Sequence, residues 1–233
     1  MDAPTQLRGV PAAWWRHYHP WGWLLLLLVA VTVTPEIDLR VSNLFYDPKF
    51  GFIDNAAVQF VRRHVPRLII LSTVVMVIGA TRLGLLRNAP VIAQMTLRQA
   101  GFLVASLLIG PGLIIESLLK PHWGRARPDE IVAFGGTMPY TPPLWISNAC
   151  THNCSFASGH AAVTFWLTAY AFLLPPRYRR AGVMVGLLLG LAVGMVRVMQ
   201  GAHFFSDVVY AGAIVLGVNA LLARIMLVDR GSA

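Results

Sequence analysis

Three short clusters in the sequence combine cations, hydroxyl or amide donors, and imidazoles. The members that could do chemistry are Lys120 and Arg127, then Ser158, Gly159 and His160, and then Arg197, His203 and Asp207. Lysine and arginine neutralise phosphate oxygens, while hydroxyl and backbone N–H groups hold the same oxygens as neutral donors. An imidazole oriented by a carboxylate is a nucleophile, and a second imidazole can act as acid and base. These residue types therefore favour phosphoryl chemistry.

The spacing suggests a role for each residue. His203 and Asp207 stand four residues apart, so on a helix Asp207 can hold one ring nitrogen of His203 protonated and leave the other free. We therefore expect His203 to attack phosphorus, and His160 to protonate the departing oxygen and later activate water. Ser158, Gly159 and the cations would bind the phosphate. This chemistry needs no metal or cofactor, and the absence of an H-E-x-x-H motif argues against a metal site.

Each cluster also has a structural explanation when it is taken alone. Lys120 and Arg127 could be interface or loop cations that keep their charges in water. Ser158 to His160 could be only a helix N-cap followed by a turn. The third cluster is harder to explain in this way, because charged side chains in membrane helices are costly and tend to mark function.

The elements that must position these residues are membrane helices. Of the 233 residues, 56% are hydrophobic and only 12% are charged, which is typical of a membrane protein. The segments long enough to span a bilayer are Trp15–Thr34, Pro66–Leu86, Gln99–Leu119, Ala161–Leu174, Ala181–Met199 and Val208–Val228. The sequence therefore predicts an all-α, integral membrane six-helix bundle that forms one domain over residues 1–233.

The basic residues set the expected orientation. The formal net charge is +9, but the basic residues are scattered between apolar runs, which argues against nucleic-acid binding and for an anionic lipid or phosphate partner. Six spans put both termini on one side, and the arginine bias of the tail and loops on that side makes it cytoplasmic. The three clusters then lie at the extracytoplasmic face.

The fifth predicted span carries a stripe of small residues. Gly182, Gly186, Gly190 and Gly194 recur every four residues and form one slowly drifting stripe on the helix. Small residues at this spacing let helices pack closely. Arg197 falls within the same arc, so we expect its side chain to point into the bundle and not toward lipid.

The joint spacing of the clusters resembles the three-part signature of the type 2 phosphatidic acid phosphatase family. The matching pattern is Lys120, six residues and Arg127-Pro128; Ser158-Gly159-His160; and Arg197, five residues, His203, three residues and Asp207. The signature region covers about residues 116–210. Two positions depart from the family pattern: Ala157 stands where proline is common and Val196 where serine is common. These departures bear on affinity and subfamily more than on the class of reaction.

The resemblance implies a metal-independent membrane phosphatase that forms a phosphohistidine. The family includes phosphatases of lipid A, phosphatidylglycerophosphate and undecaprenyl diphosphate, so the expected substrate is a lipid phosphate whose tails stay in the bilayer. We expect a lipid A type phosphatase of the bacterial inner membrane with its site facing the periplasm. The alternatives are a lipid-to-lipid phosphotransferase, an undecaprenyl diphosphate phosphatase and, from another class, a transporter of phosphorylated lipids.

Two features of the third span lead to local expectations. Glu116 lies four residues before Lys120, so it could position that lysine through a helical ion pair, or else face water. Gly110-Pro111-Gly112 should kink the span, because proline removes a backbone hydrogen bond.

Two loops lead to further expectations. Cys150 and Cys154 lie on the expected oxidising side, which favours a disulfide over two free thiols. Residues 52–68 place apolar side chains beside arginines, so this stretch could lie in the interface as an amphipathic helix or form a solvated loop.

Overall fold

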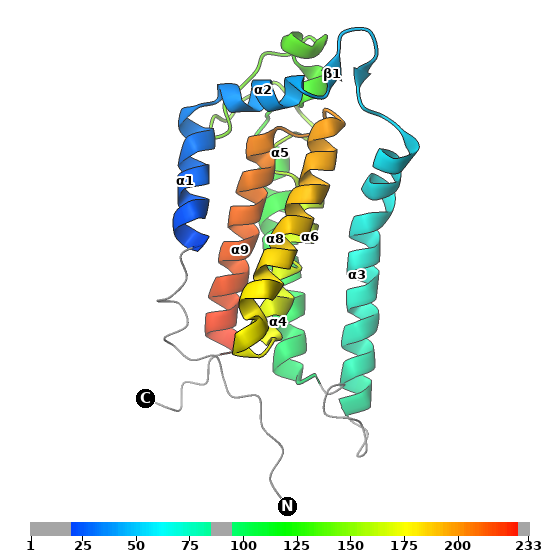
Figure 1. The fold of residues 1–233 in the computed structure, drawn as a ribbon, viewed down its shortest axis with the longest axis vertical. Coiled ribbons are helices and arrows are strands. Elements are labelled where there is room, and N and C mark those ends of the chain that lie inside the picture. Colours follow the sequence, from blue (N-terminus) through cyan, green and yellow to red (C-terminus); the bar gives the residue numbers. More distant parts are fainter. Residues whose placement is uncertain (1–19, 85–94, 228–233) are drawn as a thin grey trace, which may run out of the picture.

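Long helices run beside one another, and the two longest connections among the described residues, 34–55 and 123–158, lie together at one end, the loop end of the bundle (Figure 1). The computed structural model describes residues 20–84 and 95–227. The long elements are α1 (Pro20–Val33), α3 (Ala56–Gly84), α4 (Leu97–Leu107), the π-helix η3 (Leu108–Leu119), α8 (Pro176–Met199) and α9 (Phe205–Met226). The short helices are α2 (Glu36–Asn43), α5 (Lys120–His122), η4 (Pro128–Glu130), η5 (Val132–Phe134), α6 (Gly159–Phe165) and α7 (Thr168–Leu173). Strands β1 (Tyr46–Asp47) and β2 (Gly51–Phe52) form an antiparallel hairpin.

Three continuous helical stretches in the described residues are long and apolar enough to cross a membrane. They are Leu97–His122, Pro176–Met199 and Phe205–Met226. The first joins α4, η3 and α5, and the other two are α8 and α9. The expectation of a mostly helical membrane protein is therefore confirmed, whereas the count of six spans and the topology of the loops stay predictions.

The second predicted span is corrected at its start. We expected the helix to begin at Pro66, but α3 begins at Ala56 and contains Pro66 in its interior. Residues 56–68 are therefore helical and not a solvated loop, whereas a position in the membrane interface stays a prediction. A proline in a helix interior leaves a carbonyl one turn earlier without its usual N–H donor.

The fourth predicted span is two short helices and not one. At the junction of α6 and α7, the N–H groups of Leu167, Ala169 and Tyr170 bond to carbonyls three residues back, not four. The Thr168 hydroxyl donates to the Phe165 carbonyl at 2.8 Å, which satisfies a backbone acceptor at this break. Other predicted spans differ from the observed helices mainly at their ends, and residues 15–19, 85, 86 and 228 lie outside the described residues.

The predicted disruption at Gly110-Pro111-Gly112 coincides with a change of helix type. Residues Leu108–Leu119 form a π-helix between α4 and α5. In a π-helical stretch each N–H bonds five residues back, and such stretches within α-helices are frequent at functional sites. A kink at this point stays a prediction.

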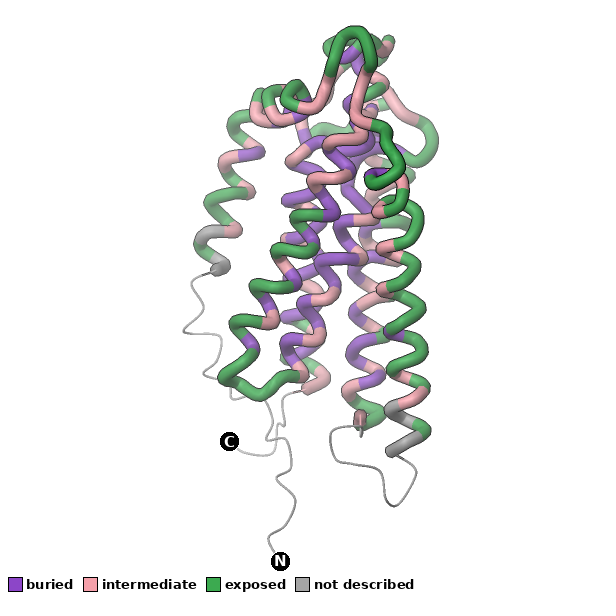
Figure 2. The backbone as a smooth tube through the Cα atoms, turned by 45° about the vertical axis from the view of Figure 1, so that its right-hand side comes forward, coloured by how far each residue is buried: buried purple, intermediate pink, exposed green. Residues whose placement is uncertain are grey.

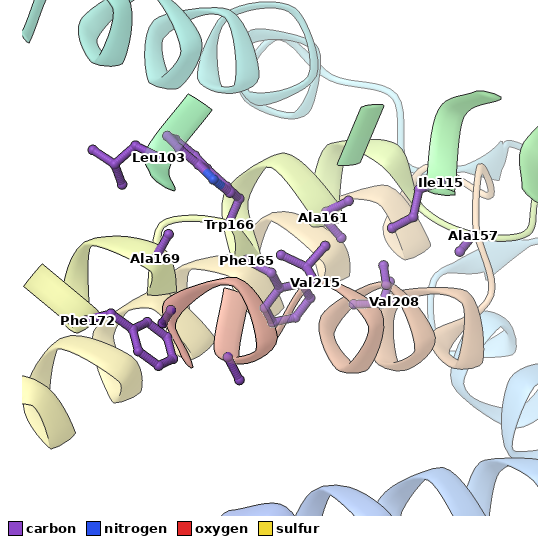
Figure 3. Close-up of a cluster of buried hydrophobic side chains, with 14 of the residues drawn as sticks. Leu103, Ile115, Ala157, Ala161, Phe165, Trp166, Ala169, Phe172, Val208 and Val215 are labelled. Carbon is purple, nitrogen blue, oxygen red and sulfur yellow. The ribbon is translucent and has the colours of Figure 1, made fainter. Parts of the chain in front are cut away.

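The buried core lies between the central helices, whereas α1 and α3 are largely exposed (Figure 2). Figure 3 shows Phe165, the last residue of α6, and Trp166, which follows it, among side chains of the neighbouring helices. Trp166 is fully buried, and its Nε1 donates to Ser106 Oγ of α4 at 2.8 Å. Exposed side chains on the outer helices include Leu25 and Leu71, as expected for a face that contacts lipid.

The glycine stripe of α8 packs closely against its neighbours, as predicted. A Cβ atom added at Gly190 would lie 2.2 Å from Phe165 Cδ1, and one added at Gly194 would lie 2.2 Å from Val208 Cγ1. These glycines therefore let α6 and α9 approach the backbone of α8. Arg197 is buried, in agreement with its predicted inward direction.

This packing predicts that Gly190→Ala destabilises the protein. Overpacking against Phe165 should cost about 1–3 kcal/mol and lower the midpoint of thermal unfolding in detergent. Gly217→Ala in α9 is the matched control, because a Cβ there meets no atom within 4 Å. Equal midpoints for the two variants would contradict close packing at the stripe.

Candidate active site

The three sequence clusters meet at the loop end of the bundle (Figure 1). Ser158 directly precedes α6, Arg197 lies in the last turn of α8, and His203 lies in the turn before α9. The Ser158 N–H donates to the Asp207 carbonyl at 3.3 Å, which joins the second cluster to the third. The structure therefore brings the predicted residues together.

His203 is buried and surrounded by the predicted cations. Its Nδ1 lies 2.7 Å from the Ser155 carbonyl oxygen. A carbonyl can only accept, so Nδ1 carries the hydrogen of the neutral ring and Nε2 keeps the lone pair. Burial, followed by the charges of Arg197, Lys120 and Arg127, holds the pKa of His203 well below its ordinary value. The ring is therefore neutral, which is the form that can act as a nucleophile.

Asp207 holds His203 less directly than expected. Its Oδ2 lies 3.9 Å from His203 Nδ1, which is an ion-pair distance but too long for a hydrogen bond. The same oxygen accepts from Ser155 Oγ at 2.5 Å and from the Phe204 N–H at 2.8 Å. Asp207 therefore fixes Ser155, and the carbonyl of Ser155 orients the histidine.

A buried arginine connects this carboxylate to the N-terminal half of the chain. Arg125 is fully buried, and its guanidinium lies 2.5 Å from Asp207 Oδ1 and 2.7 Å from Asp38 Oδ2. Asp38, on α2, also accepts from the N–H of Ser206 at 2.8 Å. Arg125 Nε donates to the Thr141 carbonyl at 2.9 Å. The paired charge of Arg125 thus connects α2, the loop between α5 and α6, and the start of α9.

Sequence reasoning missed this network. The missed residues are Asp38, Arg125, Ser155 and Ser206. Arg125 had a signal, because it lies two residues before Arg127 in the first cluster. No sequence signal pointed to Asp38, because its partner Arg125 lies 87 residues away in the chain.

The predicted ion pair between Glu116 and Lys120 is present. Lys120 Nζ lies 3.1 Å from Glu116 Oε1. The same carboxylate lies against the backbone of α6, because a Cβ added at Gly159 would be 1.7 Å from Glu116 Oε1. Gly159 is therefore required for the close approach of Glu116, in addition to its expected role beside phosphate.

The predicted disulfide is also present and helps to place Arg127. Cys150 and Cys154 are bonded, with their Cα atoms 5.6 Å apart. Between them, the Asn153 carbonyl accepts from Arg127 Nη2 at 2.7 Å and from Arg127 Nε at 3.1 Å. The disulfide loop thus holds one of the three cations of the site.

Two buried donors of the site have no acceptor in the part of the chain that the structure describes. They are Ser158 Oγ and Arg197 Nε. Buried polar atoms are nearly always hydrogen-bonded, so such exceptions need an explanation. Both residues were predicted to bind phosphate, and phosphate oxygens are strong acceptors for both kinds of donor.

The arrangement of ligand-type side chains bears on metal binding. Within residues 20–84 and 95–227, no three histidine, cysteine, aspartate or glutamate side chains are grouped closely enough to hold a metal ion. Metal-independent chemistry stays a prediction that rests on the roles of the histidines.

The sequence matches one known family. The model of the PAP2 superfamily matches residues 99–230, and the chain belongs to this superfamily. The resemblance to type 2 phosphatidic acid phosphatases is thus confirmed, and it supports a phosphatase that acts on lipid phosphates. No solved structure matches the chain significantly.

Several relatives carry more particular names. The lipid A 4'-phosphatase of Rhizobium leguminosarum is 31% identical over 203 residues, which cover 81% of this chain and 86% of that relative. The lipid A 4'-phosphatase of Francisella tularensis subsp. novicida is 42% identical over 115 residues, or 49% of this chain and 52% of the relative. The lipid A 1-phosphatase of Rhizobium etli is 39% identical over 113 residues, or 48% of this chain and 44% of the relative. The chain thus aligns with about half of each of the last two relatives.

The buried network predicts that Asp38→Asn destabilises the protein. Asparagine offers one acceptor oxygen where aspartate offers two, so a buried donor of Arg125 or Ser206 loses its partner, which should cost about 1–3 kcal/mol. Thermal unfolding in detergent measures the loss. Glu36→Gln, an exposed change on the same helix, should leave the midpoint unchanged. A midpoint for Asp38→Asn equal to that of Glu36→Gln would contradict the network.

The contact between Arg127 and Asn153 predicts that reduction of the disulfide weakens substrate binding. Opening the loop should free the Arg127 guanidinium and raise KM for a lipid phosphate several-fold, with a smaller change in kcat. Arg127→Ala should have a raised KM that reductant does not raise further. A similar effect of reductant on both proteins would show that the loop acts by some other route.

Proposed function

We propose that the protein is a membrane phosphatase that hydrolyses the phosphate ester of a lipid through a phosphohistidine on His203. The observation that carries this proposal is the pair of buried, unpartnered donors, Ser158 Oγ and Arg197 Nε, in the site that holds neutral His203. A phosphoryl group would supply acceptors to both donors and negative charge to the cations.

In the first step, His203 Nε2 attacks phosphorus and the bond between phosphorus and the lipid oxygen breaks. His160 gives its proton to that oxygen, so the lipid leaves as an alcohol. Lys120, Arg127 and Arg197 balance the charge on the phosphoryl oxygens, which is the main requirement for phosphoryl transfer. In the second step, His160 takes a proton from water, the water oxygen bonds to phosphorus, and the phosphorus–nitrogen bond breaks.

Asp207 supports the nucleophile through Ser155. The Ser155 carbonyl accepts the Nδ1 hydrogen of His203, and Asp207 fixes Ser155 through its hydroxyl. When His203 forms the phosphohistidine, the ring gains positive character, and the carbonyl and the nearby carboxylate both stabilise it. Asp207 is thus a positioning and electrostatic residue in this mechanism.

The substrate that we propose is lipid A or a precursor of it, with the 4'-phosphate preferred. The support is the similarity of the chain to three lipid A 4'-phosphatases, while two other relatives are lipid A 1-phosphatases. We also propose the bacterial inner membrane as its location, with six spans, cytoplasmic termini and the site facing the periplasm. The 1-phosphate of the same lipid is the second candidate substrate.

A lipid panel tests this function. Wild-type protein in detergent, with EDTA present, should release phosphate from a bisphosphorylated lipid A and leave the 1-monophosphate. His203→Ala should lower release by at least about 10³-fold, because no nucleophile remains. His122→Ala, a change of an exposed histidine near the site, should retain activity. Binding of lipid phosphates without release by any of these proteins would contradict a phosphatase and favour transport.

A further inference from the structure

Helix α3 presents a backbone carbonyl to the active site. In an α-helix, the N–H of each residue donates to the carbonyl four residues earlier. Pro66 lies inside α3 and has no N–H, so it cannot donate to the carbonyl of Arg62. That carbonyl oxygen is 3.1 Å from His160 Nε2, although the two residues are 98 positions apart in the sequence. The acceptor that the proline leaves open is therefore the partner of the proposed acid and base.

We propose that Pro66 is a positioning residue for catalysis: by freeing the Arg62 carbonyl, it orients the His160 ring and makes Nδ1 the nitrogen that transfers the proton. The inference rests on the proposed function of His160. A carbonyl accepts only, so Nε2 of His160 is the donor and carries a hydrogen in the neutral and the protonated ring. The proton that moves to the lipid oxygen, and later comes from water, is then the one on Nδ1.

The charges around His160 make this carbonyl important. The ring faces Arg197 of α8, Lys120 of α5 and the Arg62 side chain of α3. Burial and then these cations lower the pKa of His160 to about 4, while the hydrogen bond to the Arg62 carbonyl acts in the opposite direction. The carbonyl therefore stabilises the protonated ring that the first step requires, and a bound phosphate adds negative charge in the same sense.

Pro66→Ala tests the inference, because the new N–H competes with His160 for the Arg62 carbonyl. We expect kcat for a lipid phosphate to fall about tenfold, which is less than the roughly 10²–10⁴-fold that a general acid contributes in full, with KM changed less than about twofold. The hydrogen bond to the Arg62 carbonyl raises the pKa of His160, so its loss should lower that pKa. The fall of kcat at alkaline pH should therefore begin at a lower pH in the variant. Pro176→Ala is the control, because Pro176 is exposed and begins α8, where no earlier turn bonds to it.

The identity of the leaving group separates positioning from general damage. An aryl phosphate with an acidic phenol leaves without protonation, so Pro66→Ala should slow its hydrolysis much less than that of the lipid phosphate. In a His160→Ala background, Pro66→Ala should have no further effect. Lactic acid at position 66 gives the alanine side chain but replaces the backbone N–H by an ester oxygen. This substitution should restore kcat to the wild-type value. Equal loss with both leaving groups, additive loss in the double variant, or an unchanged kcat would each overturn the inference.

A spectroscopic readout keeps this inference distinct from the proposed function. In ¹⁵N spectra of histidine-labelled protein, His160 should carry its hydrogen on Nε2 in the wild type and lose that preference in Pro66→Ala. If the wild type releases no phosphate, the proposed function fails, but the spectra still decide whether the freed carbonyl orients the ring. A His160 ring with its hydrogen on Nδ1 in the wild type would overturn the inference even in an active enzyme.

Discussion

The structure depends on the burial of one charged side chain, the guanidinium of Arg125. A buried charge is tolerated only when it is paired and hydrogen-bonded, and here Asp38 and Asp207 flank it. Because these carboxylates come from α2 and α9, pairing fixes α2 against the helix that follows His203, the proposed nucleophile. The same Asp207 fixes Ser155, so the position of His203 follows from the position of this ion pair.

A second constraint is the repulsion among the cations of the site. Burial of Arg197 near Lys120 and Arg127 is unfavourable while nothing anionic lies between them, and the fold supplies only partial compensation. Glu116 pairs with Lys120, and the Asn153 carbonyl accepts from Arg127. In the proposed mechanism, a phosphate ester would bring the missing negative charge together with acceptors for Ser158 Oγ and Arg197 Nε, which have none among the described residues.

Much of the site could be predicted because its chemistry lies in short stretches of sequence. The three clusters, the pair of Glu116 and Lys120, and the disulfide all rest on spacings of a few residues. The glycine stripe predicted the inward direction of Arg197 because helical periodicity is local as well.

What could not be predicted depends on contacts between distant segments. No local pattern links Asp38 to Arg125, or shows that Asp207 acts through Ser155. The predicted span began at Pro66, whereas α3 contains this proline in its interior, where His160 of another element lies against the freed carbonyl. The break between α6 and α7 likewise depends on buried partners, among them the bond from Asn219 to Thr168.

The claim at the centre of this account is that His203 becomes covalently phosphorylated. Rapid mixing of the wild-type protein with a lipid phosphate, an alkaline quench and peptide mass spectrometry would locate the phosphate, because phosphohistidine survives base and not acid. The account predicts phosphate on the peptide that contains His203, appearing before free phosphate and disappearing as turnover ends. Phosphate on Ser158 or on another histidine, or full turnover with no labelled peptide, would contradict it.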